Sequence, residues 1–363
     1  MVCISLHPDF QNNTKTQLMN IKKEIFGQCP KGEKVFLYTL VNPNGISVKI
    51  TNYGAIITDI EMADKKGTKE NIVLGFKTLE EYLSADYLAN YPYFGAVCGR
   101  YCNRIAGGKL SIEGINYQLF INNGPNHLHG GETGFDKVIW SPKTIEKPDF
   151  VGLELKYRSV HLEENYPGNL DVSILYKLTH KNELQIEYKA VTDRTTVVNL
   201  TNHTYFNLNG GNDNVFNHQL QINSKKRTVN DSNLIPTGEI EEVTNSVFDF
   251  SVTKPIGKDI GSLPDGYDLN YPLDNTNKKM MFAGKLSEVP TGRSVSVFTD
   301  EPGIQIYTGY YIPSLGNRFG RYSGLALETQ HYPDSPNHPE FPTTLLHPGE
   351  TYKSKTIYLF ETH

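Results

Sequence analysis

The sequence predicts an all-β protein, a large antiparallel β-sandwich with few short helices. Its 22 Tyr and 17 Phe residues favour strands, and its 31 Gly and 20 Pro residues supply turns. Strand-like runs recur along the chain between clusters of Gly, Asn, Asp and Pro. These runs are Val35–Val41, Ile46–Ile60, Asp171–Leu178, Leu184–Val191, Ser294–Phe298 and Ile304–Ile312.

The run Leu184–Val191 shows the alternation of a strand with one buried face. Leu184, Ile186 and Tyr188 fall on one side, while the intervening residues are polar or charged. The preceding run, Asp171–Leu178, ends a few residues before it, so the two are expected to form a hairpin with a short loop. Such pairs favour a sandwich or barrel over βαβ units.

A short helix is expected only at residues 78–83. Thr78 is a suitable N-cap, and Glu81 three residues later completes a capping box. Residues 1–23 are polar and weakly patterned, so they are expected to be an N-terminal extension. Residues 24–363 contain no linker-like break in composition and are expected to form a single domain.

The net charge of -5 provides no general attraction for nucleic acid or for anionic membranes. No run approaches the roughly 18 apolar residues of a membrane span. The four cysteines are sparse for a disulfide-stabilised secreted protein, and two N-x-T sequons, at Asn199 and Asn202, fall in a segment with candidate chemistry. We therefore expect a cytoplasmic protein that binds a small molecule.

The sequence contains no dinucleotide-binding or P-loop motif and no G-x-S-x-G nucleophile elbow. We accordingly expect no cofactor and no covalent catalysis. The candidate chemistry lies instead in one carboxylate and two imidazoles. Glu328 follows a strand-like run that gives way to prolines, His129 precedes Gly130-Gly131, and His203 lies in a segment rich in Asn and Thr. Such a set can accept and donate protons, and the neighbouring amides and hydroxyls suit a polyol.

Arg104 and Asp268 could bracket vicinal hydroxyls, because one supplies a fork of donors and the other an acceptor. A competing interpretation is a metal site built from His127 and His129, at i and i+2 on a strand, with Glu132 close behind. The glycines after His129 weigh against it, since the strand is expected to end there. For Glu328 alone, an edge-strand salt bridge is the structural alternative.

Five ordered motifs resemble those of the aldose 1-epimerases, the galactose mutarotases. They are Asn103-Arg104-Ile-Ala, Leu128-His129-Gly-Gly, Gly134-Phe-Asp-Lys-Val-Ile-Trp140, Asn202-His203-Thr-Tyr-Phe-Asn-Leu208 and Leu327-Glu328-Thr-Gln330. Together with Asn52-Tyr-Gly-Ala55 and His347-Pro-Gly-Glu350, the resemblance covers nearly all of the chain beyond the N-terminal extension. It implies a galactose mutarotase-like β-sandwich that interconverts the α and β anomers of hexoses such as D-galactose and D-glucose, without cofactor or metal.

By resemblance, Glu328 is the general base, His203 the general acid and His129 a second active-site histidine. Arg104, Asn103, Asp268 and Gln305 match positions that hold substrate hydroxyls. In this scheme Glu328 is ionised at neutral pH, as an exposed glutamate would be, and His203 is protonated.

Two positions depart from the family pattern, and either could alter sugar preference. His127 stands where a small residue is common, and Leu269 stands where histidine is frequent.

Two rival functions share the fold. A hexose-6-phosphate 1-epimerase would need additional cations for the phosphate, and Arg100 is the only hint of one. A non-catalytic sugar-binding module would keep the cleft, but it would not need the acid–base set. We also expect a monomer, because no heptad or extended apolar face stands out in the sequence.

Overall fold

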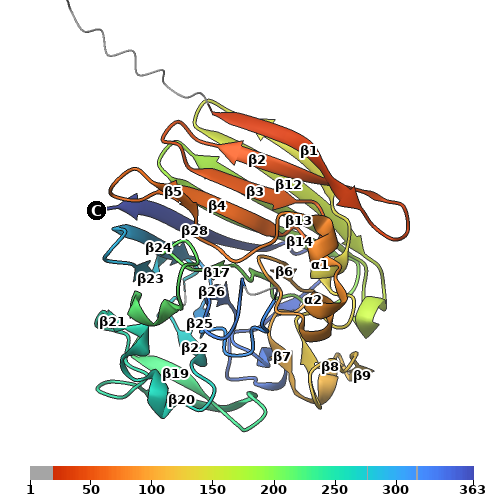
Figure 1. Cartoon of the computed structure of the whole chain (residues 1–363). Helices are drawn as coiled ribbons and strands as arrows, with labels where there is room; N and C mark the ends of the chain where they lie inside the picture. Colours follow the sequence, from red (N-terminus) through yellow and green to blue (C-terminus); the bar gives the residue numbers. More distant parts are fainter. Residues whose placement is uncertain (1–18, 276, 316–317) are drawn as a thin grey trace, which may run out of the picture.

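The structure is a computed structural model that describes residues 19–275, 277–315 and 318–363. Two antiparallel sheets in these ranges pack face to face (Figure 1). The larger sheet contains, in spatial order, β11 (Ser141–Glu146), β12 (Phe150–Ser159), β13 (Leu170–Thr179), β14 (Glu183–Thr192), β28 (Tyr352–Thr362), β24 (Arg293–Thr299), β23 (Met281–Ser287), β18 (Gln219–Ile222) and β21 (Lys254–Pro255). The second contains β1 (Asn20–Gln28), β2 (Lys34–Val41), β3 (Ser47–Thr51), β4 (Ile57–Ala63) and β5 (Lys69–Asn71).

A continuous hydrophobic core fills the space between these sheets. Leu40 and Val48 contribute from one sheet, and Leu153, Ile174 and Ile186 from the other. Side chains alternate across each strand, so every second residue enters this core. The predicted antiparallel β-sandwich is confirmed.

A third sheet and five strand pairs lie beside the sandwich. The third sheet contains β17 (Tyr205–Phe206), β26 (Leu325–Gln330), β25 (Gly303–Tyr307) and β22 (Asp268–Pro272). The pairs are β6 (Val97–Cys98) with β16 (Thr201–Asn202), β7 (Arg104–Ile105) with β10 (His127–Leu128), β8 (Lys109–Ile112) with β9 (Ile115–Gln118), β15 (Thr196–Val197) with β27 (Leu345–Leu346), and β19 (Lys226–Asn230) with β20 (Pro236–Glu242).

Helical segments in the described ranges are short. The α-helices are α1 (Leu79–Tyr82) and α2 (Ala85–Asn90). Single 3₁₀ turns are η1 (Ala106–Gly108), η2 (Phe135–Lys137), η3 (Glu163–Asn165), η4 (Val215–Asn217), η5 (Ile256–Lys258), η6 (Ile260–Ser262) and η7 (Ser335–Asn337). Thr78 caps α1 in a capping box with Glu81, as predicted. Helix α2 was not predicted from the sequence, and Ser84 caps it by accepting from the N–H of Tyr87.

Most expected strands occur near their predicted bounds, and β13 and β14 form the expected hairpin, with Leu178 opposite Leu184. The run Ile46–Ile60 differs, because it forms two strands, β3 and β4, joined by a turn at residues 52–56. Gly54 in that turn has φ +60°, and a Cβ there would lie 2.1 Å from the carbonyl oxygen of Asp136. Only glycine therefore fits, and the chain reverses direction at this point.

The boundary of the predicted N-terminal extension also differs. Residues 1–18 of the expected segment 1–23 lie outside the described residues, but Asn20 already pairs with Val41 in the β1–β2 ladder. Residues 20–23 are thus part of a strand. The β1–β2 ladder shifts register between Ile25 and Gly27. This shift interrupts the alternation of buried and exposed residues by which a strand is recognised in a sequence.

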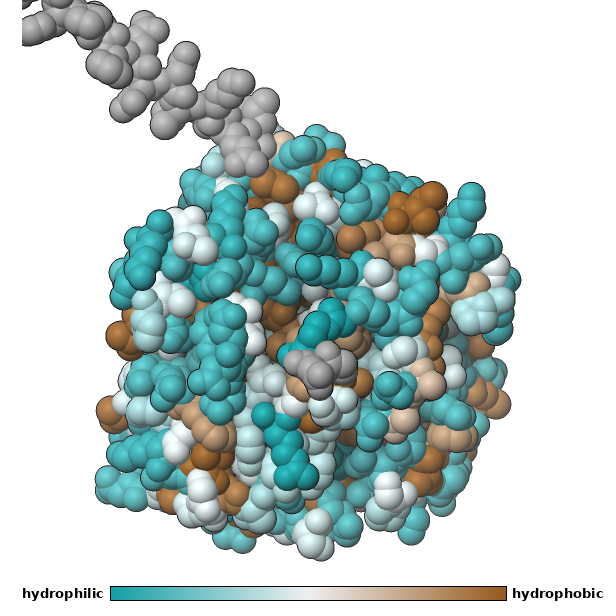
Figure 2. Space-filling model, in the orientation of Figure 1, coloured by the Kyte–Doolittle hydropathy of each residue, from teal (hydrophilic) through white to brown (hydrophobic). Residues whose placement is uncertain are grey.

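Hydrophilic residues cover most of the face shown in Figure 2, and hydrophobic residues are scattered among them. In the described part of the chain, no helix combines the length and apolar character needed to cross a membrane.

Candidate active site

A cavity of about 410 Å³ brings together residues from distant parts of the chain. Its lining includes six of the seven predicted site residues: Asn103, Arg104, His129, His203, Asp268 and Glu328. The seventh, Gln305, is buried and is not part of this lining. The volume falls within the range of small-molecule sites.

Backbone hydrogen bonds on both sides of the residue hold His203 in place. It follows β16, its N–H donates to the carbonyl of Ala96 at 2.8 Å, and its carbonyl accepts from the N–H of Gly95 at 3.0 Å. The side chain of Asn202 also donates to the carbonyl of Gly95. The imidazole therefore projects from a backbone that is fixed at residues 95–96.

The polar residues around His203 do not form the polyol-binding surface that we expected. Asn199, Asn202 and Asn207 are buried and donate to backbone carbonyls of other segments. Thr201 likewise donates to the carbonyl of Thr329. These side chains tie loops and short strands together, because buried carbonyls need donors. Both sequon asparagines, Asn199 and Asn202, are among these buried residues.

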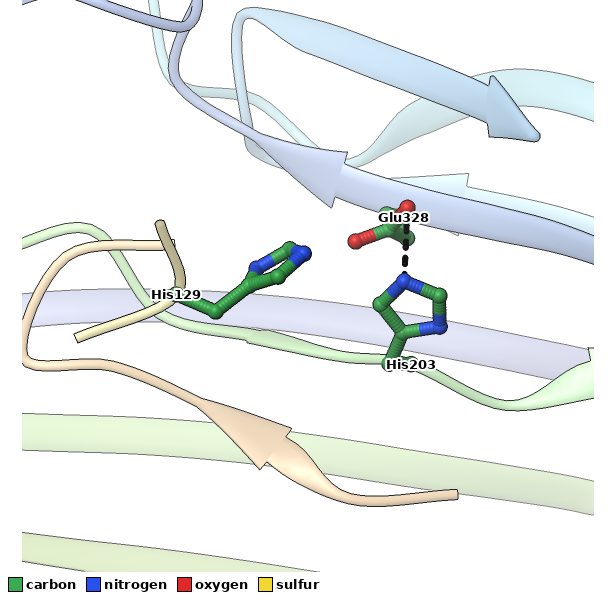
Figure 3. Close-up of side chains that lie close together, drawn as sticks. All are labelled: His129, His203 and Glu328. Carbon is green, nitrogen blue, oxygen red and sulfur yellow. Dashed lines mark ion pairs between the residues drawn. The ribbon is translucent and has the colours of Figure 1, made fainter. Parts of the chain in front are cut away.

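Glu328 lies in β26, a strand whose residues are all buried. Its Oε1 atom lies 3.6 Å from Nε2 of His203, and its Oε2 atom has no hydrogen-bond partner among the described residues (Figure 3). Glu328 therefore belongs to an interior pair and not to an exposed edge-strand salt bridge.

Burial shifts the pKa values of both groups in this pair. It raises the pKa of Glu328 well above its ordinary value, with a smaller contribution from the Asp268 carboxylate and an opposing one from Arg104. It also lowers the pKa of His203 to about 4. The two shifts have the same cause, because burial disfavours an isolated charge on either group. The expectation that Glu328 is ionised like an exposed glutamate omitted this cost of burial.

The short β7–β10 ladder positions His129, since it pairs Leu128 with Arg104. The peptide N–H of His129 donates to the carbonyl of Asn103, and the peptide N–H of Asn103 donates to Nδ1 of His129, both at 3.1 Å. A Cβ at Gly130 would lie 1.8 Å from the carbonyl oxygen of Gly99, so the chain can turn here only with glycine. Burial lowers the pKa of His129 well below its ordinary value.

Arg104, Asp268 and Gln305 form a connected polar group. Nη1 of Arg104 lies 3.8 Å from Oδ2 of Asp268, and its Nε donates to Asn123 at 3.1 Å. Gln305 donates through Nε2 to Oδ1 of Asp268 at 2.5 Å. Gln305 also lies opposite Glu328 in the β25–β26 ladder, so it shares a sheet face with both carboxylates, while Arg104 and Asp268 line the cavity themselves.

Tyr93 also lines the cavity, although it was not among the predicted site residues. Its ring lies 4.6 Å from that of His129, measured between centroids, and it stacks on His203 at 5.9 Å with an angle of 27°. Its backbone has φ +59°, which is uncommon for a residue with a bulky side chain. The chain contains 22 tyrosines, and no motif in the sequence distinguishes this one from the others.

The metal alternative based on His127 does not fit the structure. Nδ1 of His127 contacts the carbonyl oxygen of Phe120 at 2.7 Å, and Nε2 contacts the hydroxyl of Tyr166 at 2.5 Å. Both ring nitrogens are therefore occupied outside the cavity. Glu132, the third expected ligand, is exposed.

A different set, His129, His203 and Glu328, places one ligand atom from each side chain within 4.8 Å of the others. Metal-bound histidines usually donate their second ring N–H to an acceptor. Nδ1 of His129 instead receives an N–H from Asn103, which does not fit that pattern.

The two departures from the family pattern lie away from the cavity. His127 contacts Phe120 and Tyr166, while Leu269 packs in the core on the opposite face of β22 from Asp268. Neither residue is in a position to contact a sugar in the cavity.

Comparison with known proteins agrees with the geometry. A model of the family described as aldose 1-epimerase matches residues 37–359. Galactose mutarotase of Sus scrofa is 39% identical over 350 residues, which cover 94% of this chain and 99% of the relative. Aldose 1-epimerase of Escherichia coli (strain K12) is 34% identical over 343 residues, which cover 92% and 97%.

Solved structures give the same result. The crystal structure of galactose 1-epimerase from Lactobacillus acidophilus NCFM matches with a TM-score of 0.84 and 27% identity, over 95% of this chain and 99% of that one. An aldose epimerase homologue from C. elegans matches with a TM-score of 0.82 and 28% identity, over 90% and 98%. The chain therefore belongs to the aldose 1-epimerase family and is an isomerase.

Proposed function

We propose that this protein interconverts the α and β anomers of free hexoses such as D-galactose and D-glucose by general acid–base opening and reclosure of the ring. The observation that carries the proposal is the separation of 3.6 Å between His203 Nε2 and Glu328 Oε1 inside a cavity lined by hydroxyl-binding groups. The names of the relatives, galactose mutarotase and galactose 1-epimerase, support galactose as a substrate.

Ring opening requires one proton acceptor and one proton donor. Glu328 takes the proton from the anomeric hydroxyl, and His203 gives a proton to the ring oxygen. The bond between C1 and the ring oxygen breaks with its electron pair on that oxygen, while C1 and O1 form the aldehyde carbonyl. These two transfers need one proton on the pair, carried by His203, with Glu328 in its carboxylate form.

Substrate binding is expected to favour the productive distribution of that proton. A hydrogen bond from the anomeric hydroxyl stabilises the carboxylate form of Glu328, and the nearby guanidinium of Arg104 has the same effect. The remaining proton then resides on His203. Rotation about the C1–C2 bond presents the other carbonyl face, and reversal of both transfers closes the ring as the opposite anomer.

The polar group around Asp268 holds the remaining sugar hydroxyls in this proposal. Arg104 supplies donors, Asp268 an acceptor, and Asn103 an amide at the cavity wall. Gln305 acts by orienting Asp268, to which it donates a hydrogen bond. No metal or cofactor takes part in these steps.

We further propose that the protein acts in the cytoplasm as a monomer. Cys29, Cys98 and Cys102 are free thiols, and the last two are buried. Free buried thiols suit a reducing compartment. Gel filtration with light scattering tests the oligomeric state, and a mass corresponding to a dimer would contradict the monomer.

Polarimetry on freshly dissolved α-D-galactose, and then on α-D-glucose, tests the function. The purified protein is expected to speed the approach to anomeric equilibrium, and added chelator is expected to leave the rate unchanged. Protein that accelerates neither sugar would contradict the proposal. Loss of activity in chelator would contradict the metal-free mechanism.

A further inference from the structure

Asn103 and His129 form a reciprocal contact in which the peptide N–H of each residue donates to the other. One donates to a carbonyl and the other to the ring atom Nδ1 of His129, both at 3.1 Å. A peptide N–H has no lone pair and cannot accept a hydrogen bond. The lone pair of the His129 ring must therefore lie on Nδ1, and in the neutral ring the proton lies on Nε2.

From this contact we infer that the peptide of Asn103 fixes His129 as the neutral Nε2–H tautomer, so that His129 donates a hydrogen bond to a substrate oxygen and transfers no proton. Asn103 is then a positioning residue through its backbone. The inference rests on the proposed function for its substrate, but the tautomer itself is a property of the protein alone.

Protonation of His129 would place an Nδ1–H group against the Asn103 N–H in a buried site. Two donors facing each other at 3.1 Å leave both without an acceptor, which costs free energy in the interior. Burial acts in the same direction, because it lowers the pKa of His129. The pKa of His129 is lowered further by the positive charges of Arg104 and Lys137 and by any positive charge on His203 or His127.

The backbone at both residues supports a fixed arrangement. Asn103 has φ +63° and His129 has φ +50°, both in the left-handed region. Asparagine tolerates this region better than most residues, and the Asn103 side chain also accepts from the N–H of Arg104 at 2.9 Å. The adjacent residues on both segments, Leu128 and Arg104, pair in the β7–β10 ladder. The Asn103 N–H is thus held in place by its own turn and by a strand pair.

The second ring nitrogen of His129 points into the site. Figure 3 shows a ring nitrogen of His129 directed toward Glu328, and one ligand atom from each of His129, His203 and Glu328 lies within 4.8 Å of the others. A sugar oxygen between them would receive the Nε2–H. A fixed donor at this place stabilises negative charge that develops on oxygen during ring opening, as neutral imidazoles do in other isomerases.

His203 differs from His129 in the way its ring is held. Its Nδ1 atom has no hydrogen-bond partner among the described residues, and its Nε2 faces Glu328. No peptide N–H there fixes the lone pair, so this ring can gain and lose a proton. His203 therefore transfers the proton, and His129 remains a hydrogen-bond donor throughout.

Nitrogen NMR of the protein labelled with ¹⁵N-histidine tests the inference without any turnover. The His129 signals, assigned by their absence in His129→Gln, are expected to show a protonated Nε2 and an unprotonated Nδ1 that persist between about pH 5 and 8. A protonated Nδ1, or a protonation midpoint within that range, would overturn it.

Two substitutions at residue 103 form a matched pair. Asn103→Gly keeps the left-handed backbone and the peptide N–H, so the tautomer signal of His129 is expected to stay unchanged. Asn103→Val, with a β-branched side chain that disfavours positive φ, is expected to produce a mixture of tautomers. A changed ¹⁵N signal of His129 in Asn103→Gly would contradict the positioning role. This test remains valid even if Asn103→Val does not fold.

Kinetics separate a donor from a proton carrier. Glutamine retains an N–H donor but has no basic nitrogen, so His129→Gln is expected to lose about tenfold in kcat, whereas His203→Gln loses about 10²–10⁴-fold. Equal losses in the two variants would show that His129 also transfers a proton. If the protein proves inactive on every hexose, the NMR result still decides the tautomer.

Discussion

Nε2 of His203 lies 3.6 Å from Oε1 of Glu328, and both side chains are almost fully buried. The contact is too long for a hydrogen bond, and both groups are shifted by burial toward their neutral forms. A substrate that offers one hydroxyl and one ether oxygen would give each group a partner. The pair is therefore arranged for a bound sugar rather than for a strong internal ion pair.

Glu328→Gln is expected to reduce mutarotation by about 10²–10⁴-fold while leaving galactose binding within a few-fold of the original. Glutamine keeps the size and the hydrogen-bonding reach but loses basicity. Polarimetry and calorimetric titration measure the two effects. Glu301→Gln is the matched control, because Glu301 is also buried and contacts a histidine, His331, at 2.6 Å outside the cavity. Near-normal turnover in Glu328→Gln would contradict its role as base.

His203→Asn is expected to lose far more activity than His127→Asn. The ring of His127 contacts Phe120 and Tyr166 and does not line the cavity, so its loss should lower the free energy of unfolding by about 1–3 kcal/mol with little change in kcat per folded molecule. Thermal unfolding and polarimetry on both variants check this. Equal losses of kcat would show that the proton donor has been misassigned.

Glu328→Gln is also expected to be more stable than the original protein at alkaline pH. Because the pKa of Glu328 is raised in the folded protein, the folded state favours the neutral carboxyl. The resulting contribution to the free energy of unfolding is fully present below the pKa of an unfolded glutamate and is lost as pH rises through the folded pKa. Glutamine stays neutral throughout. The melting temperatures of the two proteins should therefore diverge as pH increases, and parallel curves would contradict the shift.

Tyr93→Leu is expected to lower kcat by about ten- to a hundredfold, whereas Tyr93→Phe retains most of it. The ring contacts both His129 and His203, so a non-aromatic side chain lets the two imidazoles move from their reactive positions. Phenylalanine keeps the ring and removes only the hydroxyl. A large loss in Tyr93→Phe would indicate that the hydroxyl, and not the stacking, is required.

Free hexoses are expected to be better substrates than hexose 6-phosphates, with a ratio of kcat/KM of at least about tenfold. Arg100, the one sequence hint of a phosphate site, is buried and donates to the backbone carbonyls of Pro167 and Gly168 and to Ser159. It is therefore not free to bind phosphate. Coupled assays on galactose and its 6-phosphate measure the ratio, and a preference for the phosphate would support the rival function.

Local patterns predicted the strands that have one regular buried face. The hairpin of β13 and β14 was correctly predicted because its alternation runs without interruption over both strands. The run Ile46–Ile60 was misread as one strand, since apolar residues continue through a turn that only Gly54 makes possible. The predicted bounds of the N-terminal segment failed at β1 for a related reason, a register shift at residues 25–27.

The sequence by itself determined the fold class, the family and six of the residues that meet in the cavity, because strand alternation and short ordered motifs are local properties of the chain. Tertiary structure alone decided what those residues can do. It paired Gln305 with Asp268 through a hydrogen bond, removed Arg100 and His127 from the site, and added Tyr93. It also raised the pKa of Glu328, since the cost of a buried charge depends on neighbours that only the folded chain brings together.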